Sequence, residues 1–207
     1  MPHIRGAIIA GGEARRFGGG PKGLAKVGGE RILDRLVAAF REALGCLPLL
    51  VANDPEAGRW RPDLRVVPDI KRGCGALGGL YTAVVEAPAP VICVAWDMPF
   101  VTPAFIDRLA GGGELADYDA VLPASEGRRG VEPMCAAYGS RCRQPMADAL
   151  DRGDLRAVSF HDDVQTCILP LDDVQRFRDP ALMFFNVNTE DDLERAGILW
   201  QLQESSR

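Results

Sequence analysis

Short apolar runs alternate with longer amphipathic segments along most of this sequence. The clearest run is 91–96 (VICVAW), and shorter runs occur at about 4–10, 47–52 and 64–67. Segment 32–44 instead carries apolar residues every three or four positions, as one face of a helix does. Such alternation is typical of β-α-β units, in which helices cover both faces of a mostly parallel sheet. We therefore expect an α/β fold with a doubly wound, mostly parallel sheet.

Several residues mark where the helices of this fold begin and end. Gly45 and Pro88 are expected to end two helices, at 32–44 and 78–87, and Thr102 to cap a third that begins at Pro103. The capping-box-like pair Thr189 and Asp192 predicts a terminal helix reaching about residue 202. The remaining predicted elements are strands at 120–122, 132–138 and 164–169, and a helix at 150–160 around Gly153.

Composition excludes several classes of protein. The 207 residues are 47% hydrophobic and 26% charged, which is enough apolar side chain for a core and is not typical of disorder. The length fits a single domain spanning residues 1–207. No apolar stretch approaches the roughly 20 residues of a membrane-spanning helix, and the N-terminus lacks the apolar region of a signal peptide. The net charge of −5 does not favour binding to nucleic acid. We therefore expect neither a membrane nor a nucleic acid as a partner.

The cysteines and histidines carry no metal-binding or disulfide pattern. The six cysteines form no C-x-x-C pair, and several lie in apolar runs. The two histidines have no spacing that suggests a metal site. We expect buried free thiols in a cytoplasmic protein.

A glycine-rich segment follows the first predicted strand and is the sharpest functional feature. Its glycines let backbone N–H groups approach an anion, and it carries Arg15, Arg16 and Lys22. Residues 13–31 hold five basic and two acidic side chains, so this segment is positive within an acidic protein. These features favour a phosphate cradle over a solvated surface loop. The P-loop pattern G-x-x-x-x-G-K-[ST] and the dinucleotide pattern G-x-G-x-x-G are both absent, which argues against a P-loop NTPase and a Rossmann dehydrogenase.

Polar side chains also follow the other predicted strands. Asn53, Asp69 and Asp97 each come where a strand ends, and Asn186 and Asn188 lie near the end of the chain. The carboxyl ends of parallel strands meet at one edge of a sheet, which is where open α/β sheets bind ligands. A carboxylate there, next to a phosphate loop, predicts a Mg²⁺ ligand whose shell phosphate oxygens complete. The alternative is an aspartate that only ends a strand or caps a turn.

Five segments spread along the chain together carry the motifs of one family. They are 8–18 (IIAGGEARRFG) with 21–24 (PKGL), 75–80 (GALGGL), 97–100 (DMPF), 132–138 (EPMCAAY) and 185–193 (FNVNTEDDL). They resemble the signature segments of the molybdenum cofactor guanylyltransferases, the MobA family of the nucleotidyltransferase superfamily. Phe17 replaces the usual Met, Ala76 a Pro and Glu190 another Pro. The resemblance spans essentially the whole chain, and its last segment discriminates best.

The resemblance implies a Rossmann-like nucleotidyltransferase fold and a set of residue roles. Ile9, Ala10 and Gly11 would contact the guanine nucleotide through their backbone. The other implied nucleotide contacts are Lys22 to the phosphates, Asn53 and Asp69 to the base or ribose, and Asp97 to both the nucleotide and Mg²⁺. Lys22, Asp97, Arg15 and Arg16 would carry catalysis by charge neutralisation. On the acceptor or metal side would lie Asn186, Asn188 and Arg156, the last meeting the pterin phosphate.

The implied reaction moves GMP from GTP to the terminal phosphate of molybdopterin and releases pyrophosphate, with Mg²⁺ as cofactor. The implied partners are GTP, molybdopterin or its molybdenum-bound form, other proteins of molybdenum cofactor biosynthesis and the apo-molybdoenzymes that receive the product. Two rival enzymes are a cytidylyltransferase acting on molybdopterin and a sugar-phosphate nucleotidyltransferase. Cytidylyl relatives tend to carry A-A-G in the first loop and acidic residues in the late motif, whereas this chain has Ala10-Gly11-Gly12 and two asparagines. A nucleotide-binding protein without turnover is a further alternative, which the presence of Lys22 and Asp97 disfavours.

Overall fold

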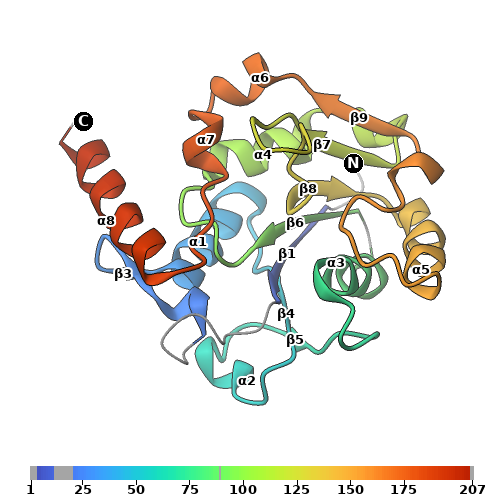
Figure 1. Cartoon of the computed structure of the whole chain (residues 1–207), viewed down its shortest axis with the longest axis horizontal. Helices are drawn as coiled ribbons and strands as arrows, with labels where there is room; N and C mark the ends of the chain where they lie inside the picture. The colour runs from blue at the N-terminus through green and yellow to red at the C-terminus, as the bar shows by residue number, and fades with distance from the viewer. Residues whose placement is uncertain (1–3, 12–20, 89, 206–207) are drawn as a thin grey trace.

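A seven-stranded sheet runs through the molecule, and helices cover both of its faces (Figure 1). The computed structural model describes residues 4–11, 21–88 and 90–205. The strands lie in the order β5-β4-β1-β6-β8-β7-β9. Their bounds are β1 Arg5–Ala10, β4 Leu49–Ala52, β5 Val66–Val67, β6 Val91–Ala95, β7 Ala120–Pro123, β8 Cys135–Tyr138 and β9 Thr166–Leu169. A separate two-stranded hairpin joins β2 (Lys26–Val27) to β3 (Glu30–Arg31).

The winding of the sheet reverses next to its central strand. From β1 the chain passes to β4 and then β5 on one side, and then returns to β6 on the other side of β1. β1 pairs in parallel with both neighbours, with Ala7 opposite Leu49 of β4 and Cys93 of β6. β8 runs antiparallel to β6 and β7, and every other pairing in this sheet is parallel. The mostly parallel α/β fold is confirmed, and the reversal places a ligand crevice beyond the carboxyl ends of β1 and β6.

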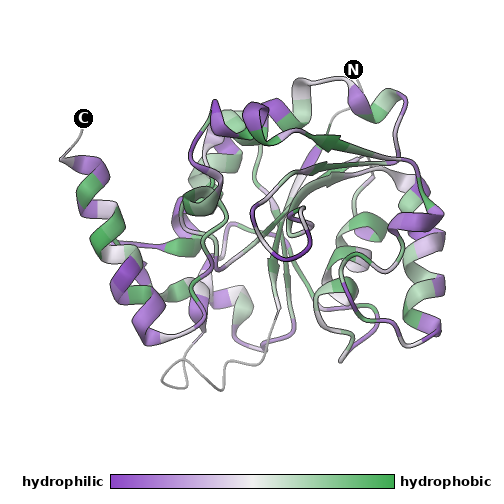
Figure 2. Cartoon of the chain, turned by 45° about the horizontal axis from the view of Figure 1, so that its top comes forward, coloured by the Kyte–Doolittle hydropathy of each residue, from purple (hydrophilic) through white to green (hydrophobic). Residues whose placement is uncertain are grey.

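Two layers of helices bury the sheet. Residues of α1 and α4 belong to the core on one face, and residues of α3 and α5 to the core on the other. Every residue of β6 is buried, as its unbroken apolar run predicts. Figure 2 shows hydrophobic strands between amphipathic helices. The helices are α1 Ile32–Leu44, α2 Ala57–Trp60, α3 Gly75–Glu86, α4 Pro103–Gly111, α5 Arg143–Asp151, α6 Leu171–Gln175, α7 Pro180–Met183 and α8 Glu190–Glu204.

The predicted helix ends at four positions are confirmed. α1 ends at Gly45, whose φ of 67° is the left-handed conformation that suits glycine. The Thr102 hydroxyl accepts a hydrogen bond from the Phe105 N–H at 3.1 Å and caps α4. Thr189 and Asp192 form a full capping box at the start of α8. α3 ends at Glu86, just before Pro88.

The predicted helix at 150–160 is wrong. The chain is helical earlier, in α5, and Gly153 lies beyond the end of that helix with φ 77°. The Asp154 N–H returns to the Ala149 carbonyl at 3.0 Å, which closes the helix in a Schellman-type turn. After this turn the chain continues through turns to a short 3₁₀ segment, His161–Asp163. α3 also starts three residues before the predicted position, because 75–80 forms its first turns rather than a loop.

The cysteines are free thiols, as the sequence predicts. All six are free, and Cys93, Cys135 and Cys142 are buried. Burial raises the pKa of Cys142 to about 12, so its thiol is neutral and inert at physiological pH. Among the helices in the described part of the chain, none is both long and apolar enough to cross a bilayer.

Two glycines in helices give a matched test of this packing. A Cβ at Gly79 of α3 would lie 2.5 Å from Ile9 Cγ2 of β1, whereas a Cβ at Gly197 of α8 would meet nothing within 4 Å. We expect Gly79→Ala to lower the free energy of unfolding by about 1–3 kcal/mol through overpacking. Gly197→Ala should raise it by up to about 1 kcal/mol through helix propensity. Urea unfolding of both variants measures this contrast, and equal effects would contradict the close packing of α3 on β1.

Candidate active site

The residues after β1, β4, β5 and β6 gather at the carboxyl edge of the sheet, as predicted. Ile9 and Ala10 end β1 and Gly11 follows it. Ile9 is only 2% exposed, so its side chain belongs to the core and only its backbone can face a ligand. Its carbonyl accepts a hydrogen bond from the Trp96 N–H at 3.2 Å, which ties the ends of β1 and β6 together. Arg15 and Arg16 lie outside the described residues.

Lys22 lies beside Asn188 and Asp97, far from both in sequence. Its Nζ donates a hydrogen bond to Asn188 Oδ1 at 2.8 Å. Burial raises the pKa of Asp97 and the charge of Lys22 partly offsets this, so the ammonium acts on that carboxyl although no ion pair joins the two within the described residues. The first loop, the end of β6 and the late motif therefore come together, because the Lys22 ammonium bonds to the Asn188 amide and its charge acts on the Asp97 carboxyl.

A stack of aromatic rings supports the backbone next to Lys22. Gly23 is buried against the Trp96 indole, and a Cβ at this position would clash with the ring. Trp96 stacks in turn on Trp60, with ring centroids 5.4 Å apart. Because only glycine fits this contact, the lysine that precedes it is held close to the end of β6.

The late motif is anchored on both sides of Asn188. The Val187 N–H donates to the Asp97 carbonyl at 2.9 Å, and the Val187 side chain is fully buried. The Asn188 N–H donates to Asp192 Oδ2 at 3.0 Å within the cap of α8. Asn186 turns its Nδ2 to the Phe184 carbonyl at 2.9 Å. Of the two asparagines, Asn188 is therefore the one that contacts Lys22.

Asn53 and Asp69 form a second polar pair at the same edge. Asn53 Nδ2 donates to Asp69 Oδ2 at 2.7 Å, and the Asp69 N–H donates back to Asn53 Oδ1 at 2.9 Å. Burial raises the pKa of Asp69, while the bond from Asn53 and the charge of Arg72 lower it. Cβ atoms at Gly78 and Gly79 would each lie 3.9 Å from a carboxylate oxygen of Asp69, so the start of α3 approaches it closely. A fixed acceptor with an amide beside it suits a ligand that offers N–H donors.

Asp97 has the surroundings of a functional carboxylate. Burial raises its pKa, and the charge of Lys22 and a backbone hydrogen bond only partly offset this. Its oxygens are hard ligands of the kind that Mg²⁺ prefers. No group of three or more His, Cys, Asp or Glu that could hold a metal occurs among residues 4–11, 21–88 and 90–205. The Asp97 carboxylate is a group that could hold a divalent ion together with oxygens from a substrate.

Glu132 is a neighbour of Asp97 to which the sequence analysis assigned no role. β6 and β8 pair antiparallel with Val94 opposite Cys135, and the Ala95 N–H donates to the Met134 carbonyl at 2.8 Å. Asp97 and Glu132 each lie two residues beyond this last bonded pair. Burial raises the pKa of Glu132, and the charge of Asp97 raises it further. Glu132 belongs to the 132–138 motif, which the sequence shows. Its position next to Asp97 follows only from the antiparallel direction of β8 relative to β6.

Arg156 lies apart from these groups. It follows α5, and its guanidinium forms two hydrogen bonds with the Asp154 carboxylate at 2.8 and 2.5 Å. No contact joins it to Lys22 or Asp97 within the described ranges. The structure thus brings Lys22, Asp97 and Asn188 together, and pairs Asn53 with Asp69.

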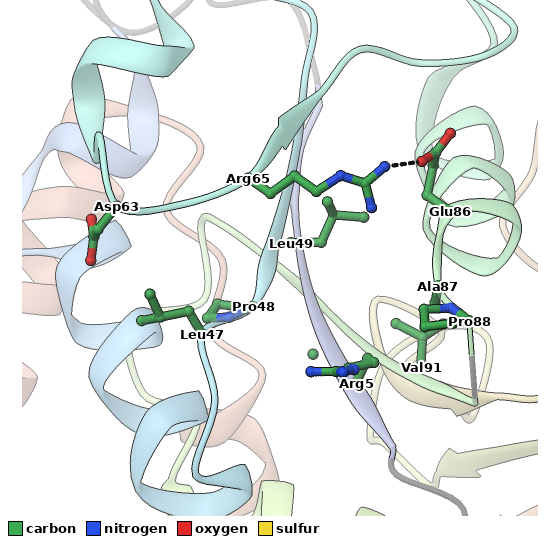
Figure 3. A pocket seen from close by; sticks show the side chains of 11 residues that line it. Arg5, Leu47, Pro48, Leu49, Asp63, Arg65, Glu86, Ala87, Pro88 and Val91 are labelled. Atoms are coloured by element: carbon green, nitrogen blue, oxygen red, sulfur yellow. Dashed lines mark hydrogen bonds and ion pairs between the residues drawn. The ribbon is translucent and has the colours of Figure 1, made fainter.

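A cavity of about 360 Å³ lies at the opposite edge of the sheet (Figure 3). Its lining includes Arg5, Leu47 and Val91, which lie at or before the amino ends of β1, β4 and β6, and the ion pair between Arg65 and Glu86. None of the predicted site residues that the structure describes lines this cavity.

The fold and the carboxyl edge define a doubly wound α/β protein with polar and charged side chains, Lys22 and Asp97 among them, at the crevice where such sheets bind ligands. Comparison with known families identifies it further. The family model described as the MobA-like NTP transferase domain matches residues 6–165. The chain belongs to this family, and the resemblance seen in its motifs is confirmed.

Relatives of similar length support this membership. The chain is 33% identical to a protein named molybdenum cofactor guanylyltransferase from Mesorhizobium japonicum, with 98% of each chain covered. It is 30% identical to a probable molybdenum cofactor guanylyltransferase from Pelotomaculum thermopropionicum, over 100% of this chain and 98% of the relative.

Solved structures share the fold. A molybdopterin-guanine dinucleotide biosynthesis protein A from Archaeoglobus fulgidus superposes with a TM-score of 0.81, at 23% identity and with 96% and 99% of the two chains covered. A Mycobacterium tuberculosis protein whose crystal structure is a complex with manganese has a TM-score of 0.61 at 19% identity, with 94% and 97% of the two chains covered. At these identities the likeness concerns the fold alone.

The electrostatics of Asp97 predict an unusual stability effect. Because its pKa is raised on folding, the folded state disfavours the charged carboxylate at every pH above that pKa. Asp97→Asn should therefore leave the melting temperature at pH 7 unchanged or higher, while lowering turnover about 10²–10³-fold. The stability difference should vanish below pH 3, where both side chains are neutral in the folded and unfolded states.

Asp34→Asn is the matched control for this experiment. Burial raises the pKa of Asp34, but hydrogen bonds and charges from Arg31 and Arg61 outweigh it and lower the pKa overall. Removing this charge should lower the melting temperature at pH 7 and leave turnover unchanged. If Asp97→Asn instead lost stability as Asp34→Asn does, Asp97 would be a turn-capping residue.

Proposed function

We propose that this chain is a molybdenum cofactor guanylyltransferase, which transfers GMP from GTP to the terminal phosphate of molybdopterin. The observation that carries the proposal is the meeting of Lys22, Asn188 and Asp97 at the crevice between β1 and β6. The substrates are inferred from the names of the relatives, and the chemistry of the residues at the carboxyl edge of the sheet matches these substrates.

We assign the guanine to the Asn53 and Asp69 pair. A carboxylate accepts hydrogen bonds from the N1–H and N2 amino groups of guanine. Adenine and cytosine do not present both donors, so part of the Asp69 carboxylate would be left unpaired with either base. The close approach of α3 to Asp69 supports this assignment, because it leaves backbone rather than bulky side chains beside the carboxylate.

The proposed transfer needs no general base. The second pKa of a phosphomonoester is near ~6, so the terminal phosphate of molybdopterin is mostly a dianion at neutral pH. One of its oxygens forms a bond to the α-phosphorus of GTP, and the bond from that phosphorus to the β-phosphate bridging oxygen breaks. Pyrophosphate leaves with the electron pair. Catalysis then consists of alignment and charge neutralisation.

Lys22 supplies the positive charge that the described residues can place at the phosphates. Its hydrogen bond to Asn188 holds the ammonium in position without removing its charge. Asp97 would hold Mg²⁺ together with phosphate oxygens, and the bound ion would stabilise the developing charge on pyrophosphate. We assign further neutralising charge to Arg15 and Arg16.

The acceptor side of the proposed site includes Asn186 and Asn188. Asn188 borders Lys22, which suits contact with either substrate. Arg156 stays a candidate for the pterin phosphate, although Asp154 already neutralises it. We also infer a cytoplasmic location, with which six free cysteines agree.

The test of this function is a nucleotide panel. The chain is incubated with molybdopterin, Mg²⁺ and GTP, CTP or ATP at matched concentrations, and released pyrophosphate is measured. We expect turnover with GTP at least about 100-fold above that with CTP or ATP, because a hydrogen bond to a charged group contributes about 1.5–3 kcal/mol and guanine offers two such donors to Asp69. Equal turnover with CTP would favour a cytidylyltransferase. Turnover only with a sugar phosphate as acceptor would favour the other rival.

Lys22→Ala tests the role of the ammonium. Turnover should fall about 100-fold or more, while the free energy of unfolding should change by no more than about 0.5 kcal/mol. Lys26→Ala is the matched control, because Lys26 is exposed on β2 four residues along the chain. It should retain turnover within about two-fold. Full activity in Lys22→Ala would mean that the Lys22 side chain takes no part in the reaction and only lies on a surface loop.

A further inference from the structure

The loop between β7 and β8 contains a polar pocket that the proposed function has not used. The pocket has a volume of about 580 Å³, and Ser125, Arg128, Arg129 and Glu132 are among its lining residues. Its lining is more polar than apolar, which suits a charged group rather than a ring system.

Backbone hydrogen bonds fix the shape of this loop. The Ser125 N–H donates to the Gly130 carbonyl and the Gly130 N–H to the Gly127 carbonyl, both at 2.9 Å. An isolated bridge pairs Ala124 with Val131, and Gly130 adopts a φ of 70°. The two arginines thus project from a closed turn rather than from a long unstructured loop.

Both arginines are exposed, and the charge of Arg129 acts on the nearby Glu132 carboxyl, whose pKa it lowers against the larger effect of burial. Neither guanidinium forms a hydrogen bond or an ion pair within the described ranges, whereas Arg141 and Arg156 pair with Asp119 and Asp154. Glu132 lines the same pocket, but its Oε1 accepts a hydrogen bond from the Met134 N–H at 2.9 Å. The backbone therefore holds this carboxylate, and within the described ranges it forms no hydrogen bond or close ion pair with either arginine, although the charge of Arg129 reaches it.

The pocket borders the metal side of the candidate active site. β8 is the direct neighbour of β6, and Glu132 and Asp97 each lie two residues past the last bonded pair of these strands. A ligand in the pocket therefore lies on the β8 side of Asp97, whereas Asn53 and Asp69 lie on the β4 and β5 side. One nucleotide and one acceptor could approach Asp97 from these two sides.

We propose that Arg128 and Arg129 bind the terminal phosphate of the acceptor, so that the β7–β8 loop is the acceptor-phosphate subsite. This inference rests on the proposed function. A phosphomonoester dianion carries about two negative charges, and two exposed guanidinium groups on one turn, neither of them in a close ion pair within the described residues, match that charge and offer forked N–H donors. Arg156 matches it less well because Asp154 already neutralises its charge.

Direct acceptor binding tests the subsite. Pterin fluorescence reports the Kd of molybdopterin for the wild type, Arg128→Ala, Arg129→Ala and the double variant, each saturated with a non-hydrolysable GTP analogue. We expect Kd to rise about 3–10-fold in each single variant and at least about 30-fold in the double variant. Arg141→Ala removes an exposed arginine at the far edge of the sheet and should leave Kd unchanged.

The dephosphorylated pterin makes the test specific for the phosphate. It should bind the wild type and the double variant with equal Kd, because the effects of removing the phosphate and removing its arginines are not additive when the two interact. Calorimetry should give the same Kd for the GTP analogue in all variants. An unchanged molybdopterin Kd in the double variant, or an equal loss for the dephosphorylated pterin, would overturn the subsite. Weakened binding of the GTP analogue with an unchanged Kd for molybdopterin would also overturn the subsite, because the arginines would then bind the nucleotide.

These outcomes separate the subsite from the proposed function. If the wild type releases no pyrophosphate from GTP, the guanylyltransferase proposal fails, and the binding measurements still report on the arginines. If the wild type turns over GTP normally and the double variant keeps its KM for molybdopterin, only the subsite fails. A double Arg→Lys variant keeps both charges and should recover part of the lost affinity.

Discussion

β6 is buried along its whole length between β1 and β8, and the place where it ends decides where Asp97 lies. Its five residues pair with β1 residue by residue, and the Trp96 N–H extends that pairing to the Ile9 carbonyl. The glycine-rich segment that follows β1 and the Asp97 carboxylate therefore start from adjacent strand ends. The late motif is joined to the end of β6 by the hydrogen bond that the Val187 N–H donates to the Asp97 carbonyl. Loss of the pairing between β1 and β6 would therefore move Lys22, Asp97 and Asn188 away from one another.

The same burial that positions Asp97 makes its negative charge costly. Burial raises the pKa of Asp97, and Lys22 offsets only part of the effect. Glu132 adds a second carboxylate on the β8 side, where the charge of Asp97 raises its pKa as well. A site with these properties gains from a bound cation more than an exposed carboxylate would. Under the proposed function, the stability that this charge costs without ligand would be exchanged for affinity toward a divalent ion and its phosphates.

Much of the fold follows from local sequence signals. The apolar run of β6, the glycine at the end of α1 and the capping residues of α4 and α8 all act within a few residues, and each prediction from them is confirmed. The helix expected at 150–160 failed because Gly153 was taken as part of a helix when it ends one. Its left-handed conformation depends on a hydrogen bond from the next residue to Ala149, which periodicity does not reveal.

The site residues that directly follow parallel strands could be predicted from the sequence, whereas the contacts of the other site residues could not. Asp97, Asn53 and Asp69 follow strands, so their shared edge could be inferred from the parallel topology alone. The contact between Lys22 and Asn188 joins residues 166 positions apart and requires the folded chain. Glu132 and the arginine pocket depend on β8 running antiparallel, which no residue in 132–138 encodes by itself. The preference for Asn188 over Asn186 likewise depends on the cap of α8.

A crystal structure with GTP and Mn²⁺ tests the central claim most directly. Manganese replaces Mg²⁺ at oxygen ligands and gives an anomalous signal that locates it. The account predicts an anomalous peak coordinated by the Asp97 carboxylate, phosphates against Lys22, and guanine against Asn53 and Asp69. A nucleotide in the cavity of Arg5 and Arg65 at the opposite edge, or a metal peak away from Asp97, would contradict it.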